Sequence, residues 1–163
     1  MVKLLGAVMT GGACAYLGIR MRMTLRTREK TLAALITSLE MLESEISFSV
    51  NRLKKALKSS DRTGIFTLAA DKIGEMTAGE ALAFAVESGK TRLCLTGADC
   101  EAILTLAPTL GKTDCAEQIK CIRYVKSLIS ELHKAAQDGS ARLGKVYALG
   151  GVLVGLFIVI VLI

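Results

Sequence analysis

Acidic side chains are the first residues of this sequence that could do chemistry. Glu40, Glu43 and Glu45 lie close together along the chain. Paired carboxylates serve as general acids and bases, and they also bind cations. No nucleophile accompanies them here, and the one histidine, His133, falls on the polar side of a predicted helix. We therefore interpret the three glutamates as a solvated helix face, and leave open whether they contact a partner or a cation.

The cysteines predict neither a metal site nor a disulfide framework. Their number is odd and no two have the CxxC spacing that is typical of zinc ligands. They are Cys14, Cys94, Cys100, Cys115 and Cys121. Free thiols, buried as small apolar side chains in a reducing cytoplasm, fit this pattern.

Motifs of the common enzyme classes are missing from the sequence. It contains no P-loop, no GxGxxG after a strand, no HExxH and no GxSxG. Its glycine-rich stretches lie in the apolar ends of the chain and not at a phosphate-binding loop. The sequence therefore predicts a protein that is not an enzyme, with no cofactor, no metal and no small-molecule substrate.

The middle of the chain has the pattern of a helical bundle. A single proline and no tryptophan among frequent Ala, Leu, Glu and Lys favour an all-α protein. From residue 31, apolar side chains recur at spacings of three, four and seven, which predicts one packing face: Leu32, Leu35, Leu39, Leu42, Ile46 and Leu53. We expect a compact bundle of about five or six helices over residues 27–138.

Capping residues indicate where these helices begin. Three pairs place an acid three residues after a capping residue: Thr77 and Glu80, Thr96 and Asp99, Asp114 and Glu117. A break is expected over residues 47–51, where Asn51 can cap the next helix. The last helix of the bundle should run from Cys115 toward Gln137, or continue beyond it. Five of its side chains should point inward: Ile119, Ile122, Val125, Leu128 or Ile129, and Leu132.

Both ends of the chain are apolar enough to suggest membrane spans. Residues 146–163 carry no charge and no proline, and at about 1.5 Å per residue they reach roughly 27 Å, near the hydrocarbon thickness of a bilayer. Residues 4–19 are also uncharged. We expect transmembrane helices over residues 1–22 and 142–163. Two other interpretations of the N-terminal end stay open, a signal peptide cleaved after Ala15 and a lipoprotein site at Cys14.

Small residues in the predicted spans suit close packing of helices. Gly151 and Gly155 have the GxxxG spacing that lets two helix backbones approach in lipid. The first span is interspersed with small residues, among them Gly11 and Ala15. We expect a contact between the two spans or with a partner, and we leave a homo-oligomer open.

The net charge of +6 belongs to the ends of the chain. Residues 31–141 carry 13 Lys and Arg against 14 Asp and Glu, so the excess lies outside them. Basic residues follow the first apolar stretch and precede the second: Arg20, Arg22, Arg26, Arg28, Arg142 and Lys145. By the positive-inside rule, they predict that the middle of the chain is cytoplasmic. A nucleic-acid surface would need a basic stripe with aromatic residues on the folded part, so no nucleic-acid partner is expected.

Several segments, in this order, resemble the stage III sporulation protein AB family of endospore-forming bacteria. They are Lys3–Val8, Leu39–Ile46, Leu95 with Thr96 and Asp99, Leu110 and Gly111 with Thr113, Asp114 and Gln118, and Gly150–Leu156. The LG-x-TD-x-x-x-Q segment is the most specific of them. The chain departs from the family at Asn51-Arg52-Leu53, where the family often has Thr-Pro-Leu.

The resemblance implies a non-enzymatic membrane platform or scaffold in the channel between mother cell and forespore, needed for endospore formation. The region between the spans would be similar to the cytoplasmic domain of platform protein F of type II secretion and type IV pilus systems. The implied partners are the membrane, other channel subunits and an assembly ATPase. The implied location is the mother-cell membrane around the forespore, with the helical domain in the cytoplasm. The alternative is a membrane-tethered helical adaptor or regulator of an unrelated cytoplasmic partner.

Overall fold

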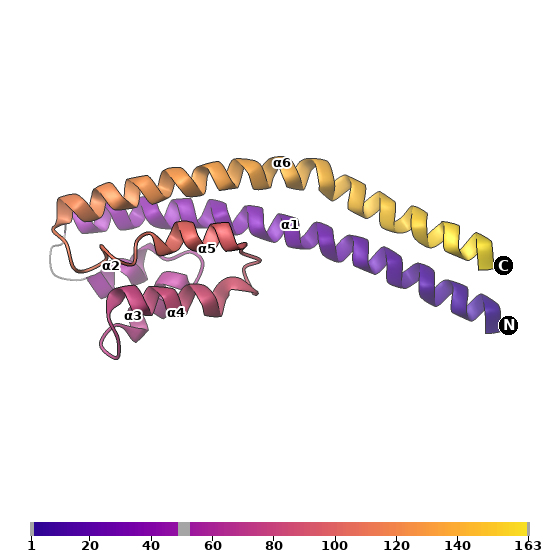
Figure 1. The fold of residues 1–163 in the computed structure, drawn as a ribbon, viewed down its shortest axis with the longest axis horizontal. Coiled ribbons are helices and arrows are strands. Elements are labelled where there is room, and N and C mark those ends of the chain that lie inside the picture. Colours follow the sequence, from indigo (N-terminus) through magenta and orange to yellow (C-terminus); the bar gives the residue numbers. More distant parts are fainter. Residues whose placement is uncertain (1, 49–52, 163) are drawn as a thin grey trace. The chain divides into compact units, whose positions relative to one another are not determined.

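The computed structural model describes residues 2–48 and 53–162, and the elements in these ranges are helices. In chain order they are α1 (Val2–Phe48), α2 (Leu53–Ser60), α3 (Ile65–Lys72), α4 (Ala78–Lys90), α5 (Gly97–Leu104) and α6 (Cys115–Leu162) (Figure 1). Ile73 and Met76, between α3 and α4, form an isolated β-bridge. The prediction of an all-α protein is confirmed.

The chain divides into two compact units. The first, which we call the terminal unit, consists of Met1–Glu29 and Ala135–Ile163. The second, which we call the helical unit, is Lys30–Lys134. The helical unit therefore contains the C-terminal part of α1, all of α2 to α5, and the first part of α6.

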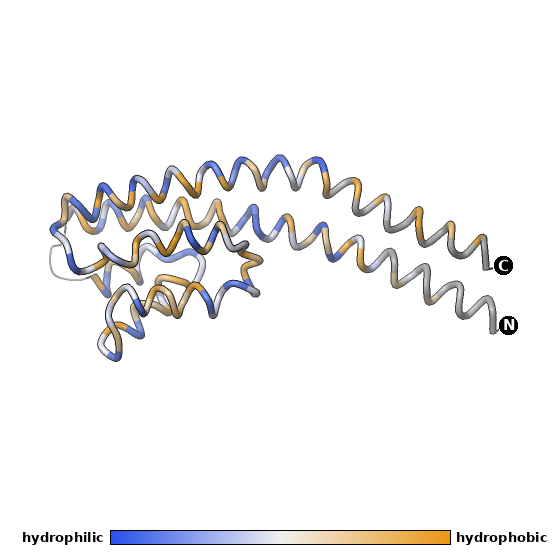
Figure 2. The backbone as a smooth tube through the Cα atoms, in the orientation of Figure 1, coloured by the Kyte–Doolittle hydropathy of each residue, from blue (hydrophilic) through white to orange (hydrophobic). Residues whose placement is uncertain are grey.

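The core of the helical unit forms around the predicted leucine face of α1. Leu32, Leu35, Leu39 and Leu42 are at most 2% exposed. They share one side of the helix because they are three or four residues apart in the sequence. The shorter helices add further buried apolar side chains: Leu57, Phe66, Leu82, Val86 and Ile103. Figure 2 shows the resulting alternation of apolar and polar residues along each helix. The predicted packing face is confirmed from Leu32 to Ile46, whereas Leu53 is partly exposed.

One predicted capping box is present in full, and the helix start predicted at Thr96 is a second full box. At the start of α4, the Thr77 hydroxyl accepts from the Glu80 N–H, and the Glu80 carboxylate accepts from the Thr77 N–H at 2.9 Å. The side-chain hydrogen bond from Thr77 holds the pKa of Glu80 below its usual range. Thr96 and Asp99 make the same reciprocal pair at the start of α5, with the Thr96 N–H 2.8 Å from the carboxylate. Each box satisfies backbone N–H groups that the first helical turn leaves without a partner.

The start of α3 depends on Asp61, which lies in the segment between α2 and α3. One carboxylate oxygen of Asp61 accepts from the N–H groups of Thr63 and Gly64. The other accepts from the Thr67 N–H at 2.8 Å. Burial raises the pKa of Asp61, but the hydrogen bonds from Thr67, Thr63 and Gly64 outweigh it and hold the pKa below its ordinary value. Gly64 has a φ of 86°, which glycine adopts readily.

The predicted helix boundaries hold at two places. α1 ends at Phe48 and α2 begins at Leu53, as expected, although the proposed cap Asn51 lies outside the described residues. α6 begins at Cys115 and continues past Gln137 to Leu162. Of the two alternatives for its inward face, Ile129 is buried and Leu128 is partly exposed.

The terminal unit is helical but exposes its apolar side chains. Residues that are more than half exposed include Met9, Tyr16, Leu17, Met21, Met23, Val146, Leu149, Leu153, Val154, Phe157 and Ile160. The transmembrane helices expected over residues 1–22 and 142–163 are not confirmed. Within the residues described, no helix has a stretch that is both long enough and apolar enough to cross a bilayer.

Candidate functional site

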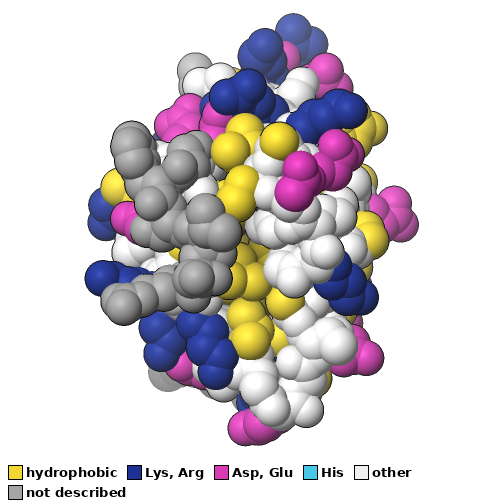
Figure 3. Space-filling view, turned by 90° about the vertical axis from the view of Figure 1, so that its left-hand side faces the viewer, with side chains coloured by type: hydrophobic (Ala, Val, Ile, Leu, Met, Phe, Trp, Pro, Cys, Tyr) yellow, Lys and Arg dark blue, Asp and Glu magenta, His cyan; other side chains and the backbone are white. Residues whose placement is uncertain are grey.

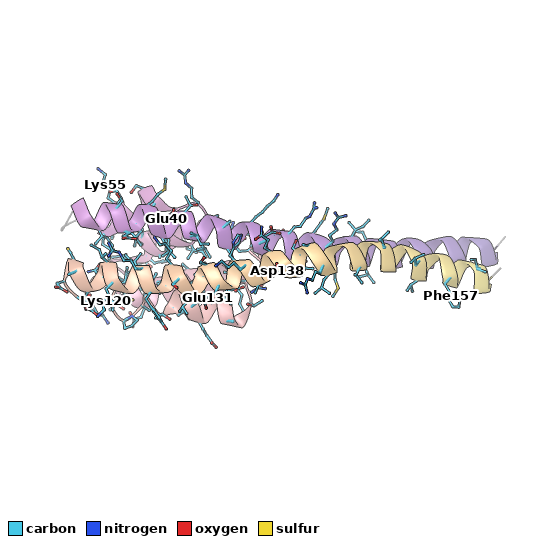
Figure 4. All side chains as sticks on the ribbon, turned by 90° about the horizontal axis from the view of Figure 1, so that it is seen from above. Glu40, Lys55, Lys120, Glu131, Asp138 and Phe157 are labelled. Carbon is cyan, nitrogen blue, oxygen red and sulfur yellow. The ribbon has the colours of Figure 1, made fainter. Side chains whose placement is uncertain are left out.

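The helical unit has a charged face where α1 and α6 run side by side (Figure 4). The Arg123 Nε donates to one oxygen of Glu43 at 2.6 Å. The Lys126 ammonium lies 3.4 Å from the other oxygen of Glu43 and 3.9 Å from the carboxylate of Glu40. We call these four residues the ion-paired face. It connects two helices that are far apart in the sequence.

Glu43 is the centre of the ion-paired face. Its side chain is 19% exposed, against 55% for Glu40. The hydrogen bond from Arg123 lowers the pKa of Glu43, and although burial acts in the opposite direction, the charges of Lys126 and Arg123 add to the lowering. Glu43 therefore stays ionised near neutral pH and is not suited to act as a general acid.

The prediction that the glutamates form a solvated face is wrong for Glu43, because Arg123 and Lys126 of the same chain hold it. The sequence did contain a signal for this pairing. Glu40 and Glu43 are three residues apart, as are Arg123 and Lys126, so each pair lies on one side of its helix. We also left open whether the three glutamates bind a cation. Among the described residues, no group of three or more potential ligands could hold a metal ion.

A polar groove of about 330 Å³ adjoins the ion-paired face. Its other lining residues are Ile36, Ser127, Ser130, Glu131 and Lys134. The groove therefore offers hydroxyl groups and charges of both signs. Figure 3 looks at the end of the helical unit where α6 begins, and there too Lys, Arg, Asp and Glu are interspersed around apolar side chains. Such a surface can form directional hydrogen bonds and ion pairs with a protein partner.

The LG-x-TD-x-x-x-Q segment builds the turn that leads into α6. Leu110 is buried, and Gly111 has a φ of 73°. The Asp114 carboxylate accepts from the Glu117 N–H at 3.3 Å, and the Gln118 amide donates to the Thr113 carbonyl at 2.7 Å. These contacts complete one half of the predicted capping box. The five predicted residues, Leu110, Gly111, Thr113, Asp114 and Gln118, thus lie together and have a structural role here.

The residues predicted to set topology and helix packing belong to the terminal unit. Arg20 lies over the Tyr16 ring, 5.9 Å from its centre. The other described arginines of this set are exposed or partly exposed: Arg22, Arg26, Arg28 and Arg142. The surroundings of Lys145, Gly11, Ala15, Gly151 and Gly155 lie outside the described part of the structure, so their roles stay predictions.

The described cysteines are free thiols: Cys94, Cys100, Cys115 and Cys121. Burial raises the pKa of the Cys100 thiol, which makes it a poor nucleophile. The Cys121 thiol lies 3.6 Å from the Thr105 carbonyl and can donate to it. Cys14 has no described side chain. The interpretation as free thiols is confirmed for the four that are described, but only Cys100 is buried, whereas Cys94, Cys115 and Cys121 are partly exposed.

The comparisons with known proteins point to one family. The family model described as stage III sporulation protein AB matches residues 3–163. A solved structure titled "Stage III sporulation protein AB (SpoIIIAB)" is 20% identical, has a TM-score of 0.64, and matches over 71% of this chain and 97% of that chain. At this identity, the structural likeness shows a shared fold. No curated protein matches the chain.

Proposed function

Because the chain belongs to the stage III sporulation protein AB family, we propose that it is a non-enzymatic scaffold of the channel between mother cell and forespore. In this proposal the helical unit binds an assembly ATPase and other channel subunits, as its resemblance to the platform protein F domain implies. The terminal unit holds it at the mother-cell membrane around the forespore, with the helical unit in the cytoplasm.

The observation that carries the proposal is the ion-paired face with its adjoining groove. Arg123 uses its Nε to hold Glu43, yet its side chain is 67% exposed. An arginine has five N–H donors, so the remaining four can reach a partner while the pair with Glu43 fixes the guanidinium. Charges that are already held in place lose less entropy when a partner binds. They also favour partners with complementary charge.

Exposed apolar residues support a membrane location for the terminal unit. Leu149, Leu153 and Phe157 recur every four residues along α6, and each is at least 63% exposed. Each such side chain gains about 1.5–3 kcal/mol when it leaves water, so a row of them favours lipid or a partner surface.

The proposal is tested by complementing a deletion strain during sporulation. Three affinity-tagged versions of the full chain are compared. They are the wild type, a face variant with Arg123→Ala and Lys126→Ala, and a control variant with Lys55→Ala and Lys120→Ala. Both control lysines are exposed and lie outside the ion-paired face (Figure 4). We expect the wild type and the control to restore spore formation and to co-purify the ATPase. The face variant should lose at least tenfold in both measurements.

A second variant separates lost contacts from lost stability. Glu43→Gln removes the internal ion pairs but keeps Arg123 and Lys126, so it should co-purify the partners better than the face variant. The proposal is refuted if the deletion strain forms spores normally. It is also refuted if the face variant behaves as the wild type does. Recovery of an unrelated cytoplasmic enzyme in place of channel subunits would favour an adaptor function.

A further inference from the structure

A second groove in the helical unit lies between α5 and α6 and measures about 440 Å³. Its lining combines four apolar side chains with one hydroxyl and two acids: Ala98, Ala102, Leu128, Leu132, Thr105, Glu101 and Glu131. Glu131 also lines the polar groove beside the ion-paired face. The sequence pattern predicts that Leu132 points inward, together with one of Leu128 and Ile129. Leu128 and Leu132 are instead partly exposed, because they line this open groove. The groove therefore has apolar surface that the core of the helical unit does not cover.

The two acids of this groove differ from Glu43. Glu101 and Glu131 are exposed, and neither forms an ion pair with another residue in the described part of the chain. Figure 4 shows Glu131 on α6. A groove that is apolar inside and acidic beside it fits a segment that is apolar in the middle and basic on either side.

The chain itself contains such a segment in α1. Arg20, Met23, Arg26 and Lys30 are three or four residues apart, so they lie on one side of the helix. All four are exposed, and Met23 is 60% exposed. We call them the basic stripe. Methionine is flexible enough to fill an irregular apolar groove, and the arginines one turn before and after it supply the positive charge.

We propose that the basic stripe of a second copy of this chain docks in the groove between α5 and α6. Met23 would pack against Leu128 and Leu132, with Arg20 and Arg26 beside Glu101 and Glu131. Groove and stripe are different surfaces of the same chain, so the contact is heterologous. Contacts of this kind continue from copy to copy and form a ring or a row instead of stopping at a dimer. This self-assembly goes beyond the proposed binding of channel subunits.

Charge reversal tests the proposal with the purified full chain in mild detergent. The groove variant carries Glu101→Arg and Glu131→Arg, and the stripe variant carries Arg20→Glu and Arg26→Glu. In either variant alone, groove and stripe have the same sign and repel each other. In an equimolar mixture, each variant supplies the complement of the other. Sedimentation velocity over a range of concentrations measures the assembly.

We expect the wild type to form oligomers larger than dimers, less readily at high salt because the charges are exposed. Each variant alone should need at least a tenfold higher concentration to assemble, and the mixture should recover the wild-type behaviour. A control with Glu117→Arg and Asp138→Arg, two exposed acids elsewhere on α6, should assemble as the wild type does. Circular dichroism checks that every variant keeps its helical content.

Three results would overturn the proposal. They are a wild type that stays monomeric, a groove variant that assembles normally, and a mixture that assembles no better than its components. Loss of assembly in the groove variant but not in the stripe variant would also overturn it, and would show that another segment of this chain occupies the groove. None of these results depends on the ATPase, so this proposal and the proposed function can fail separately.

Discussion

The helical unit and the terminal unit use the same residue types in opposite ways. Phe66 in α3 is 1% exposed, whereas Phe157 in α6 is 67% exposed. The helical unit encloses its leucines and aromatic residues between helices, and so supplies its own apolar environment. The described apolar residues of the terminal unit are largely exposed, and such exposed apolar surface is typical of sites that contact lipid or a partner. The helical unit therefore has a buried core of its own, and the described part of the terminal unit does not.

Charge follows the same division. In the helical unit, acids and bases pair with one another, as Glu43 does with Arg123 and Asp71 does with Lys58. In the terminal unit, five arginines stand against two acids, Glu29 and Asp138. Paired charges make a folded unit soluble without a strong field of one sign, whereas an excess of basic residues suits an anionic membrane surface.

The sharpest way to break this comparison is to remove the same side chain from each unit. Phe66→Ala leaves a cavity in the core and should lower the free energy of unfolding by about 3–5 kcal/mol. Phe157→Ala should change it by less than about 0.5 kcal/mol, because this side chain makes little internal contact. Denaturant unfolding of the full chain in mild detergent, followed by circular dichroism, measures both values.

In a vesicle-binding assay, we expect Phe157→Ala to have the larger effect of the two variants. Phe157→Ala should bind about tenfold more weakly to anionic vesicles, because a large apolar group no longer leaves water. Phe66→Ala should bind as the wild type does while it stays folded. Equal losses of stability for the two variants would show that the terminal unit has a core of its own, and the comparison would then be wrong.

Two glycines offer a second test, with a smaller expected effect. A Cβ added to Gly79 in α4 would lie 2.4 Å from the Ala107 carbonyl oxygen, so backbone must move. Gly79→Ala should therefore cost about 1–3 kcal/mol of unfolding free energy. A Cβ added to Gly139 in the terminal unit meets nothing within 4 Å. Gly139→Ala should stabilise the helix by up to about 1 kcal/mol. A shift of the thermal midpoint in the same direction for both would contradict this prediction.

Local sequence patterns were enough to predict much of the helical unit. The leucine spacing from Leu32 to Leu42, the capping box at Thr77 and the helix start at Thr96 each involve residues within one or a few turns. Such signals depend on helix geometry, which does not change from one protein to another. The distinction between Leu128 and Ile129 needed the structure, because it depends on where α5 leaves a groove beside α6.

The parts that sequence could not give depend on distant residues or on solvent. The partner of Glu43 is 80 positions away, and the matching three-residue spacings of Glu40 with Glu43 and of Arg123 with Lys126 do not say that the two helix faces meet. Asp61 caps α3 across a turn of six residues, which matches no standard capping spacing. Hydropathy alone predicted two membrane spans, and these are not confirmed. The mean hydropathy of a segment does not show whether lipid, another helix or a partner covers its apolar side chains.

The ion pair of Glu43 gives the smallest expected effect, and pH gives it a specific signature. The pKa of Glu43 is lowered in the folded protein, mainly by the hydrogen bond from Arg123. Its stabilisation is therefore present above the unfolded carboxyl pKa, about 4.3, and is lost as pH falls through the lower folded value. Glu43→Gln should cost about 1 kcal/mol at pH 7, and the difference from the wild type should disappear in strong acid.

Glu45→Gln, at a residue without an ion pair in the described chain, should change stability by only a few tenths of a kcal/mol at any pH. Parallel stability curves for the wild type and Glu43→Gln from pH 7 to pH 3 would show that the pair does not stabilise the helical unit. The ion-paired face would then act only in binding. The charges of the helical unit, like those of the terminal unit, would not contribute to folding.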